Sequence, residues 1–128
     1  MKHIRAAQGG PKPVGPYSQA VVANGLVFTA GQIPAVPGGD MPADFTGQVR
    51  QTFANLAMVL TEAGSDLSKV VKVNAYLAEE DRMEEFNEIY HEIFGPEHVP
   101  ARTTVAVGLW GVRLEMDCVA VCHPEPNA

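Results

Sequence analysis

Hydrophobic and polar positions at the start of the chain predict a β-hairpin. Residues 18–23 and 26–32 form two apolar-rich runs that are separated by Asn24-Gly25, the dipeptide that most strongly favours a two-residue hairpin turn. The preceding segment, 8–16, is so rich in glycine and proline that it excludes a helix. The first organised unit is therefore a hairpin that follows a loop.

Two helices and a strand are predicted next. Apolar residues recur at helical spacing over 43–63 and stop at Gly64. Residues 70–77 alternate with a period of two, which is typical of a half-buried strand. A second helix follows and ends at Gly95. Its buried stripe is Met83, Phe86, Ile89, Tyr90 and Ile93.

The last unit has the pattern of a second hairpin, with strands near 102–109 and 112–122 on either side of Trp110-Gly111. An even loop sets Arg102 opposite Val119. One face is then almost wholly apolar: Thr103, Val105, Val107, Leu109, Val112, Leu114, Met116, Cys118 and Ala120. We expect both helices to cover this face, which predicts an α+β fold with a mainly antiparallel sheet and two helices on one side.

The opposite face of this predicted hairpin carries the charged groups. Arg102 begins a strand that is otherwise uncharged, and a guanidinium in a half-buried position needs an anion. In the expected register Asp117 is diagonal to Arg102, roughly 7 to 8 Å away, and Glu115 is roughly 14 Å away. Two interpretations stay open: Arg102 pairs with Asp117 as structure, or it binds the carboxylate of a small ligand.

Composition narrows the class of protein. The 128 residues suffice for one core, so we expect a single domain over 1–128. The net charge of −6 argues against nucleic acid as a partner, and no apolar run approaches the length of a membrane span, so we expect a cytoplasmic protein. Cys118 and Cys122 lie too far apart on one strand for a disulfide, and the four histidines have no metal-ligand spacing.

Several motifs resemble the RidA/YjgF family of enamine/imine deaminases over about residues 3–121. They keep the family's order and separations. The motifs are Gly15–Ala20, Val27–Pro34, Phe86–Tyr90, Pro100–Val105 and Leu114–Asp117. The resemblance implies a chorismate-mutase-like fold and a homotrimer with clefts between subunits. It also implies hydrolysis of reactive 2-imino acids, which arise from enamines such as 2-aminoacrylate and 2-aminocrotonate, to 2-keto acids and ammonia, without a cofactor or a metal.

The same resemblance implies a role for each site residue. Arg102 would bind the substrate carboxylate, helped by the backbone N–H of Gly31. Glu115 would hold or activate the attacking water, and the backbone carbonyl of Thr104 would meet the imine nitrogen. Tyr17 and Asn87 would line the cleft.

Two residues depart from the family pattern. Thr104 stands where members often have cysteine, and Ala30 stands where they often have serine. A role for the Thr104 carbonyl tolerates the first change, whereas the missing hydroxyl at Ala30 could widen the pocket or shift substrate preference. Two alternatives to a deaminase remain: a non-catalytic trimer that binds small carboxylates or acts like a chaperone, and an endoribonuclease, which the acidic charge disfavours.

Overall fold

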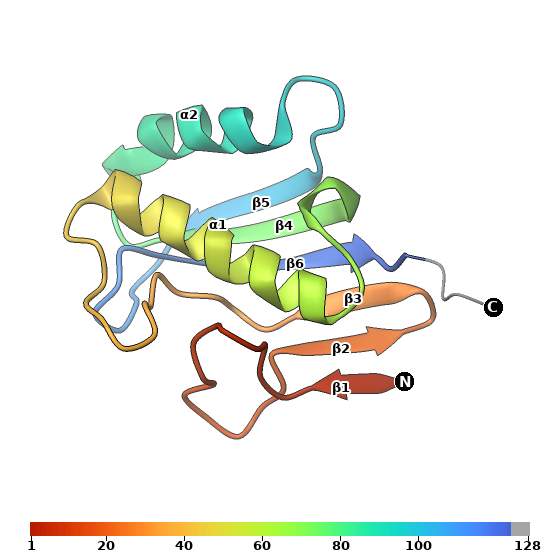
Figure 1. The fold of residues 1–128 in the computed structure, drawn as a ribbon. Helices are drawn as coiled ribbons and strands as arrows, with labels where there is room; N and C mark the ends of the chain where they lie inside the picture. Colours follow the sequence, from red (N-terminus) through yellow and green to blue (C-terminus); the bar gives the residue numbers. More distant parts are fainter. Residues whose placement is uncertain (124–128) are drawn as a thin grey trace.

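A computed structural model describes residues 1–123 of the chain as one sheet with two helices against it (Figure 1). The six strands lie in the order β1-β2-β3-β6-β4-β5. The strands are β1 (Lys2–Ile4), β2 (Ala20–Ala23), β3 (Leu26–Thr29), β4 (Val70–Leu77), β5 (Ala101–Ala106) and β6 (Leu114–Val121). The α-helices are α1 (Phe45–Glu62) and α2 (Met83–Phe94). The predicted α+β class and the placement of both helices on one face are confirmed.

The first hairpin forms as the sequence predicts. β2 and β3 pair antiparallel, with Ala23 opposite Leu26. Asn24 and Gly25 both adopt positive φ, 56° and 79°, as the favoured hairpin turn requires. β1, which the sequence pattern did not predict, pairs with β2 and extends the sheet by one short edge strand.

The helices begin and end close to the predicted residues. Asp44 caps α1 by accepting a hydrogen bond from the Gly47 N–H at 3.1 Å. Gly64 and Gly95, which follow the two helices, both adopt positive φ, as predicted helix stops do. The helices and the sheet enclose one core, whose largest fully buried side chains include Phe86, Leu56, Leu60, Leu77, Leu114 and Met116.

The predicted hairpin between residues 102–109 and 112–122 is wrong. β4 lies between these two strands, pairing parallel with β5 and antiparallel with β6. Residues 107–113 connect β5 to β6. This connection passes the end of β4 and is long enough to cross one intervening strand. The sequence pattern favoured pairing between the two strands that are consecutive in the chain. The observed order instead places β4 in the middle of the sheet, where the side chains that face the helices are fully buried.

This topology also corrects the predicted faces. Arg102 is opposite Val73, and Thr104 is opposite Ala75, so both side chains lie on the helix-covered face. Glu115 and Asp117 lie on the other face, beside Tyr76 and Asn74. The shared face that the hairpin register predicted for Arg102, Glu115 and Asp117 therefore does not exist within one chain.

The same correction applies to the apolar set. Leu114, Met116, Cys118 and Ala120 face the helices and are buried, as predicted. Thr103 and Val105 instead face away from the helices and are exposed. In β4, a register shift between Val70 and Lys72 buries Val70 and exposes Val71, so the simple alternation fails at the start of that strand.

Both cysteines are free, as expected. Cys118 is buried in the core, and burial raises the pKa of its thiol to about 12. A thiol with that pKa stays protonated at neutral pH, which is consistent with a core residue and not with a nucleophile.

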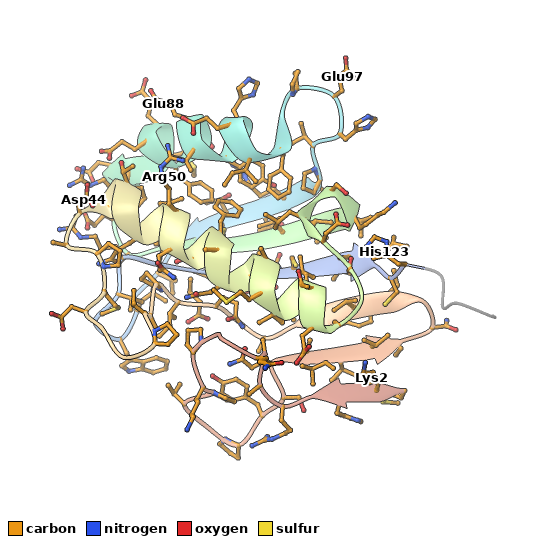
Figure 2. All side chains as sticks on the ribbon, viewed as in Figure 1. Lys2, Asp44, Arg50, Glu88, Glu97 and His123 are labelled. Atoms are coloured by element: carbon orange, nitrogen blue, oxygen red, sulfur yellow. The ribbon has the colours of Figure 1, made fainter. Side chains whose placement is uncertain are left out.

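Among residues 1–123, no helix covers the far side of the sheet (Figure 1). Its surface combines a polar cluster with apolar side chains that remain 41–46% exposed: Phe28 on β3, Val105 on β5 and Val121 on β6. By contrast, the outer surface of the helix layer is charged, with Arg50, Glu88 and Glu97 projecting from it (Figure 2). The uncovered face of the sheet therefore presents apolar side chains beside its polar cluster.

Candidate functional site

Arg102 lies against aromatic rings of α2. Its guanidinium carbon is 4.7 Å from the ring centroid of Tyr90 and 5.4 Å from that of Phe86. Such cation–π contacts stabilise a cation without neutralising it. Within residues 1–123, Arg102 forms no ion pair, and Asp117 is on the other face of the sheet. The predicted Arg102–Asp117 pair is therefore not formed, and the guanidinium keeps its N–H groups for another anion.

An open groove surrounds Arg102. It is lined by Arg102 and Pro100 at the start of β5, and by Asn87, Tyr90 and His91 on one side of α2. Asn87 and His91 are four residues apart on the helix and are both exposed, so they present polar groups beside the guanidinium. The structure thus brings together Arg102 and Asn87, two of the predicted site residues.

Thr104 lies two residues beyond Arg102 on the same face of β5. In an edge strand, the backbone N–H and C=O groups of every second residue bond to the neighbouring strand, and those of the residues between them point to the free edge. Val107 belongs to the first set, since its N–H donates to the Leu77 carbonyl of β4 at 2.9 Å. By this alternation, the backbone carbonyl of Thr104 points away from β4, toward the free edge of the sheet. The carbonyl is therefore available to a ligand, as the predicted role requires.

Glu115 lies on the opposite face, in close contact with the backbone of Gly31. A Cβ added at Gly31 would overlap the Oε2 atom of Glu115 and come within 2.8 Å of its Cδ. Gly31 has no positive φ, so glycine is needed here for close approach and not for backbone conformation. The contact explains why glycine occupies position 31 and fixes where the carboxylate lies.

A small cavity of about 80 Å³ lies at this contact. Its lining includes Glu115, Gly31, Tyr17, Gln19 and Lys12. The Tyr17 hydroxyl accepts a hydrogen bond from Val14 N–H at 3.3 Å, and the Tyr17 carbonyl accepts one from Arg5 at 2.7 Å. These bonds tie Tyr17 to the glycine- and proline-rich loop and to Arg5, which follows β1, and Tyr17 borders the cavity.

Asp117 supports this second region and does not pair with Arg102. Its two carboxylate oxygens accept hydrogen bonds from Asn74 at 2.8 Å and from the Tyr76 hydroxyl at 2.9 Å. Burial first, and then the neighbouring Asp117 charge, raise the pKa of Glu115 above its ordinary value. A carboxyl with a raised pKa is a stronger base, which is the property that proton transfer at neutral pH requires.

Polar atoms that are buried without a hydrogen-bond partner occur at both regions. Within the described residues these are the side-chain oxygens of Gln19, Tyr90 and Thr104. Buried polar groups are normally paired, and exceptions need an explanation. Gln19 lines the cavity at Glu115, Tyr90 lines the groove at Arg102, and Thr104 follows Arg102 on its strand. The sequence analysis missed Gln19 and treated Tyr90 only as a core residue, because nothing in the pattern distinguishes an unpaired buried polar atom from a paired one.

The predicted site residues therefore form two separate groups in one chain. Arg102, Asn87 and Thr104, with Tyr90, are here called the arginine half-site; Glu115, Gly31 and Tyr17, with Gln19, are called the glutamate half-site. The sheet separates them, since Arg102 and Glu115 lie on opposite faces. No group of three or more His, Cys, Asp or Glu within residues 1–123 is arranged to hold a metal ion.

Comparisons with known proteins place most of the chain in one family. The sequence model described as Endoribonuclease L-PSP matches residues 8–122. The protein mmf1 of Schizosaccharomyces pombe, whose name calls it mitochondrial, is 44% identical over 112 residues, 84% of this chain and 68% of the relative. TdcF of Escherichia coli, whose name describes it as a candidate reactive intermediate deaminase, is 32% identical over 126 residues, 94% of this chain and 98% of TdcF.

Solved structures have the same fold. The crystal structure of Escherichia coli TdcF with bound serine aligns with a TM-score of 0.86 and 33% identity, covering 95% of this chain and all of the other. In the part of the chain that the structure describes, no helix reaches the length and apolar character that crossing a bilayer takes. A cytoplasmic location stays a prediction, since one relative is named as mitochondrial.

Proposed function

Since this chain belongs to the RidA/YjgF family, we propose that it hydrolyses small 2-imino acids to 2-keto acids and ammonia, as an enzyme that acts on a C=N bond. The observation that supports this most directly is the state of Arg102, a cation placed on aromatic rings with no anion among residues 1–123. A planar guanidinium that is partly buried on aromatic rings and open to a groove suits the carboxylate of a small acid. TdcF binds serine, which also carries a carboxylate next to its nitrogen-bearing carbon.

We propose that the active site is completed between subunits of a homotrimer. Arg102 and Glu115 lie on opposite faces of one sheet, so a small molecule bound to the first cannot reach the second in the same chain. A neighbouring copy that packs on the uncovered sheet face can supply the missing half-site. The exposed Phe28, Val105 and Val121 on that face favour such an interface, because apolar patches of this kind mark association surfaces.

The proposed chemistry needs only groups that the two half-sites contain. Arg102 binds the substrate carboxylate, and the Thr104 carbonyl and Asn87 orient its nitrogen. Glu115 takes a proton from water as the water oxygen bonds to the imine carbon, and the electron pair of the C=N bond moves to nitrogen. That proton passes to nitrogen and gives a carbinolamine.

The second half of the reaction reverses the proton movement. Glu115 takes the hydroxyl proton of the carbinolamine, the C=O bond forms, and the C–N bond breaks. The nitrogen leaves with the returned proton as ammonia. One imino acid and one water thus become one keto acid and one ammonia, Glu115 ends unchanged, and no metal or cofactor takes part in this scheme.

An imine-release assay tests the proposal. An amino-acid oxidase generates the imino acid, and ammonia formation is measured with and without the protein. We expect acceleration by the wild type, and a kcat/KM that falls roughly 10- to 100-fold in Arg102→Ala, because a charge-assisted bidentate contact is lost. Arg50→Ala is the matched control, since Arg50 pairs with Glu92 on the outer surface, away from both half-sites.

Two outcomes separate the alternatives. Ammonia release by the wild type at the rate of the protein-free reaction excludes a deaminase. If calorimetry then still detects binding of 2-oxobutanoate that depends on Arg102, the protein is a small-carboxylate binder. If carboxylate binding is absent as well, a chaperone-like trimer remains to be tested.

The family model's description makes an endoribonuclease the second candidate. The net charge of −6 disfavours an RNA-binding surface, because phosphate contacts need clustered cations. Incubation of RNA with wild type and with Arg102→Ala tests this candidate. Cleavage that is equal in both samples is independent of the arginine half-site, whereas cleavage lost in the variant favours a ribonuclease at this site.

A further inference from the structure

Gln19 has one side-chain group that is paired and one that is not. It is only 3% exposed and lies immediately before β2, at the end of the glycine- and proline-rich loop. Its Nε2 donates to the Pro11 carbonyl at 2.8 Å, which fixes the orientation of the amide. Its Oε1 is buried without a hydrogen-bond partner among the described residues. The orphan atom is therefore a hydrogen-bond acceptor with no donor.

The position of Gln19 couples it to the Glu115 region. Gln19 lines the same small cavity as Glu115 and Gly31. Its backbone carbonyl accepts a hydrogen bond from Ala30 N–H at 2.8 Å, so Gln19 is tied directly to the residue before Gly31. A buried amide oxygen without a partner destabilises the fold, and the cavity that Gln19 lines is the nearest space in which a small donor could bind.

Two of the polar side chains that line this cavity, Gln19 and Glu115, need the same kind of partner, a hydrogen-bond donor. An ionised Glu115 only accepts hydrogen bonds, and the unpaired side-chain atom of Gln19 is Oε1, which is also an acceptor, whereas its Nε2 already donates to the Pro11 carbonyl. A water molecule has two hydrogens to donate and fits a cavity of about 80 Å³. The nitrogen of a neutral imine carries only one hydrogen and cannot donate to both acceptors at once.

We propose that Gln19 Oε1 and the Glu115 carboxylate together hold the attacking water, each accepting one of its hydrogens. With both hydrogens so directed, a lone pair of the water oxygen is free to bond to the imine carbon. Glu115 takes the proton, and Gln19 orients the water without changing its own protonation. This inference rests on the proposed imine hydrolysis and adds Gln19 to its catalytic residues.

The variant Gln19→Met removes the acceptor with little change in volume. We expect kcat to fall roughly 10- to 100-fold, which corresponds to the loss of one buried hydrogen bond. KM and the affinity for 2-oxobutanoate stay within about twofold, because the carboxylate is bound by the other half-site. Gln8→Met is the matched control, since Gln8 is exposed and lies outside the cavity. A wild-type kcat in Gln19→Met, measured on an active wild-type enzyme, overturns the role of Gln19 and leaves the proposed function intact.

Two further variants separate catalysis from structure. Gln19→Glu keeps an acceptor but loses the donor to Pro11, so its kcat should exceed that of Gln19→Met; equal losses assign the effect to the Pro11 contact and overturn the proposal. Combined with Glu115→Gln, Gln19→Met should cost little more than Glu115→Gln alone, because both residues act on one water. Fully additive losses show that they do not share it.

A high-resolution crystal structure of the wild type gives a test that needs no variant to fold. We expect an ordered water within hydrogen-bond distance of both Gln19 Oε1 and the Glu115 carboxylate. A protein donor that occupies Oε1 in the assembled molecule overturns the proposal. A wild type that does not accelerate imine hydrolysis at all overturns the proposed function and this inference together.

Discussion

At the scale of single residues, the glutamate half-site depends on a contact that only glycine permits. Gly31 has an ordinary backbone conformation, so nothing in its dihedral angles requires glycine. The requirement comes from Glu115, whose carboxylate lies where a side chain at position 31 would lie. The Glu115 carboxylate thus occupies space that a Cβ at position 31 would take.

This contact predicts the effect of Gly31→Ala. The new methyl group would displace the Glu115 carboxylate, because the backbone of residue 31 is tied to the sheet through the neighbouring Gln32–Met116 hydrogen bonds and cannot easily move. We expect kcat to fall at least about tenfold, since misplacing a catalytic group by about 1 Å has effects of that size or larger. Steady-state kinetics on the imine substrate measure it.

Gly108→Ala is the control for this prediction. Gly108 also has no positive φ, and a Cβ there meets no atom within 4 Å. We therefore expect the activity and folding of Gly108→Ala to match those of the wild type. Wild-type kcat in Gly31→Ala would mean that the carboxylate works equally well in a displaced position, which contradicts the geometry argued here.

At the scale of elements, the pairing of β4 with β6 sets the environment of Glu115. Asn74 and Tyr76 of β4 stand opposite Asp117 and Glu115 of β6. Their side chains donate to Asp117, which keeps a second carboxylate close to Glu115 on the same strand face. Two carboxylates at neighbouring positions on one face of a strand repel each other when both are ionised. This repulsion adds to burial in raising the pKa of Glu115.

This arrangement predicts a pH effect of Asp117→Asn. In the proposed mechanism Glu115 acts as a base when it is ionised, so the rate should fall as pH falls through its pKa. Burial and the Asp117 charge hold that pKa above its ordinary value, and removing the charge lets it decrease. The acid limb of the kcat/KM profile should therefore move to lower pH in Asp117→Asn.

The matched control is Asp44→Asn, which changes a charge at the N-cap of α1, away from the cavity. Its acid limb should coincide with that of the wild type. Each profile is measured after subtraction of the uncatalysed hydrolysis at the same pH. An acid limb of Asp117→Asn that is unchanged or moves to higher pH contradicts the assigned cause.

At the scale of the whole molecule, the sheet separates two incomplete half-sites. Arg102 lies under α2 at one edge, and Glu115 faces the side of the sheet that no helix covers (Figure 1). In a closed ring of identical copies, each interface brings the same pair of surfaces together, so every active site would take one half-site from each of two neighbours.

This assembly predicts complementation between inactive variants. In the proposed homotrimer, Arg102→Ala and Glu115→Gln would each disable every site. A hybrid trimer contains one interface that joins an intact Arg102 to an intact Glu115, so about one third of its sites should be active. Mixing the two proteins under conditions of subunit exchange, followed by the imine assay, measures this recovery. Two inactive parents that stay inactive after verified exchange show that each site belongs to one chain.

The sequence predicted local structure more reliably than long-range pairing. The Asn24-Gly25 turn, the helix stops at Gly64 and Gly95 and the buried side of β6 all follow from patterns within a few residues. The pairing of β5 with β6 was wrong, because apolar alternation shows which side of a strand is buried but not which strand lies beside it. That error moved Arg102 to the wrong face and made Asp117 one of two candidate partners for it.

The sequence by itself determined the residue kinds that the proposed chemistry uses, the helices and most strands, and a resemblance that the comparisons confirmed as membership of the family. Tertiary structure alone decided that β4 separates β5 from β6 and thereby divided Arg102 from Glu115. It also decided that the oxygen of Gln19 is buried without a partner. Both features depend on contacts between segments far apart in the chain, whose energies are set by packing and burial and leave no local pattern in the sequence.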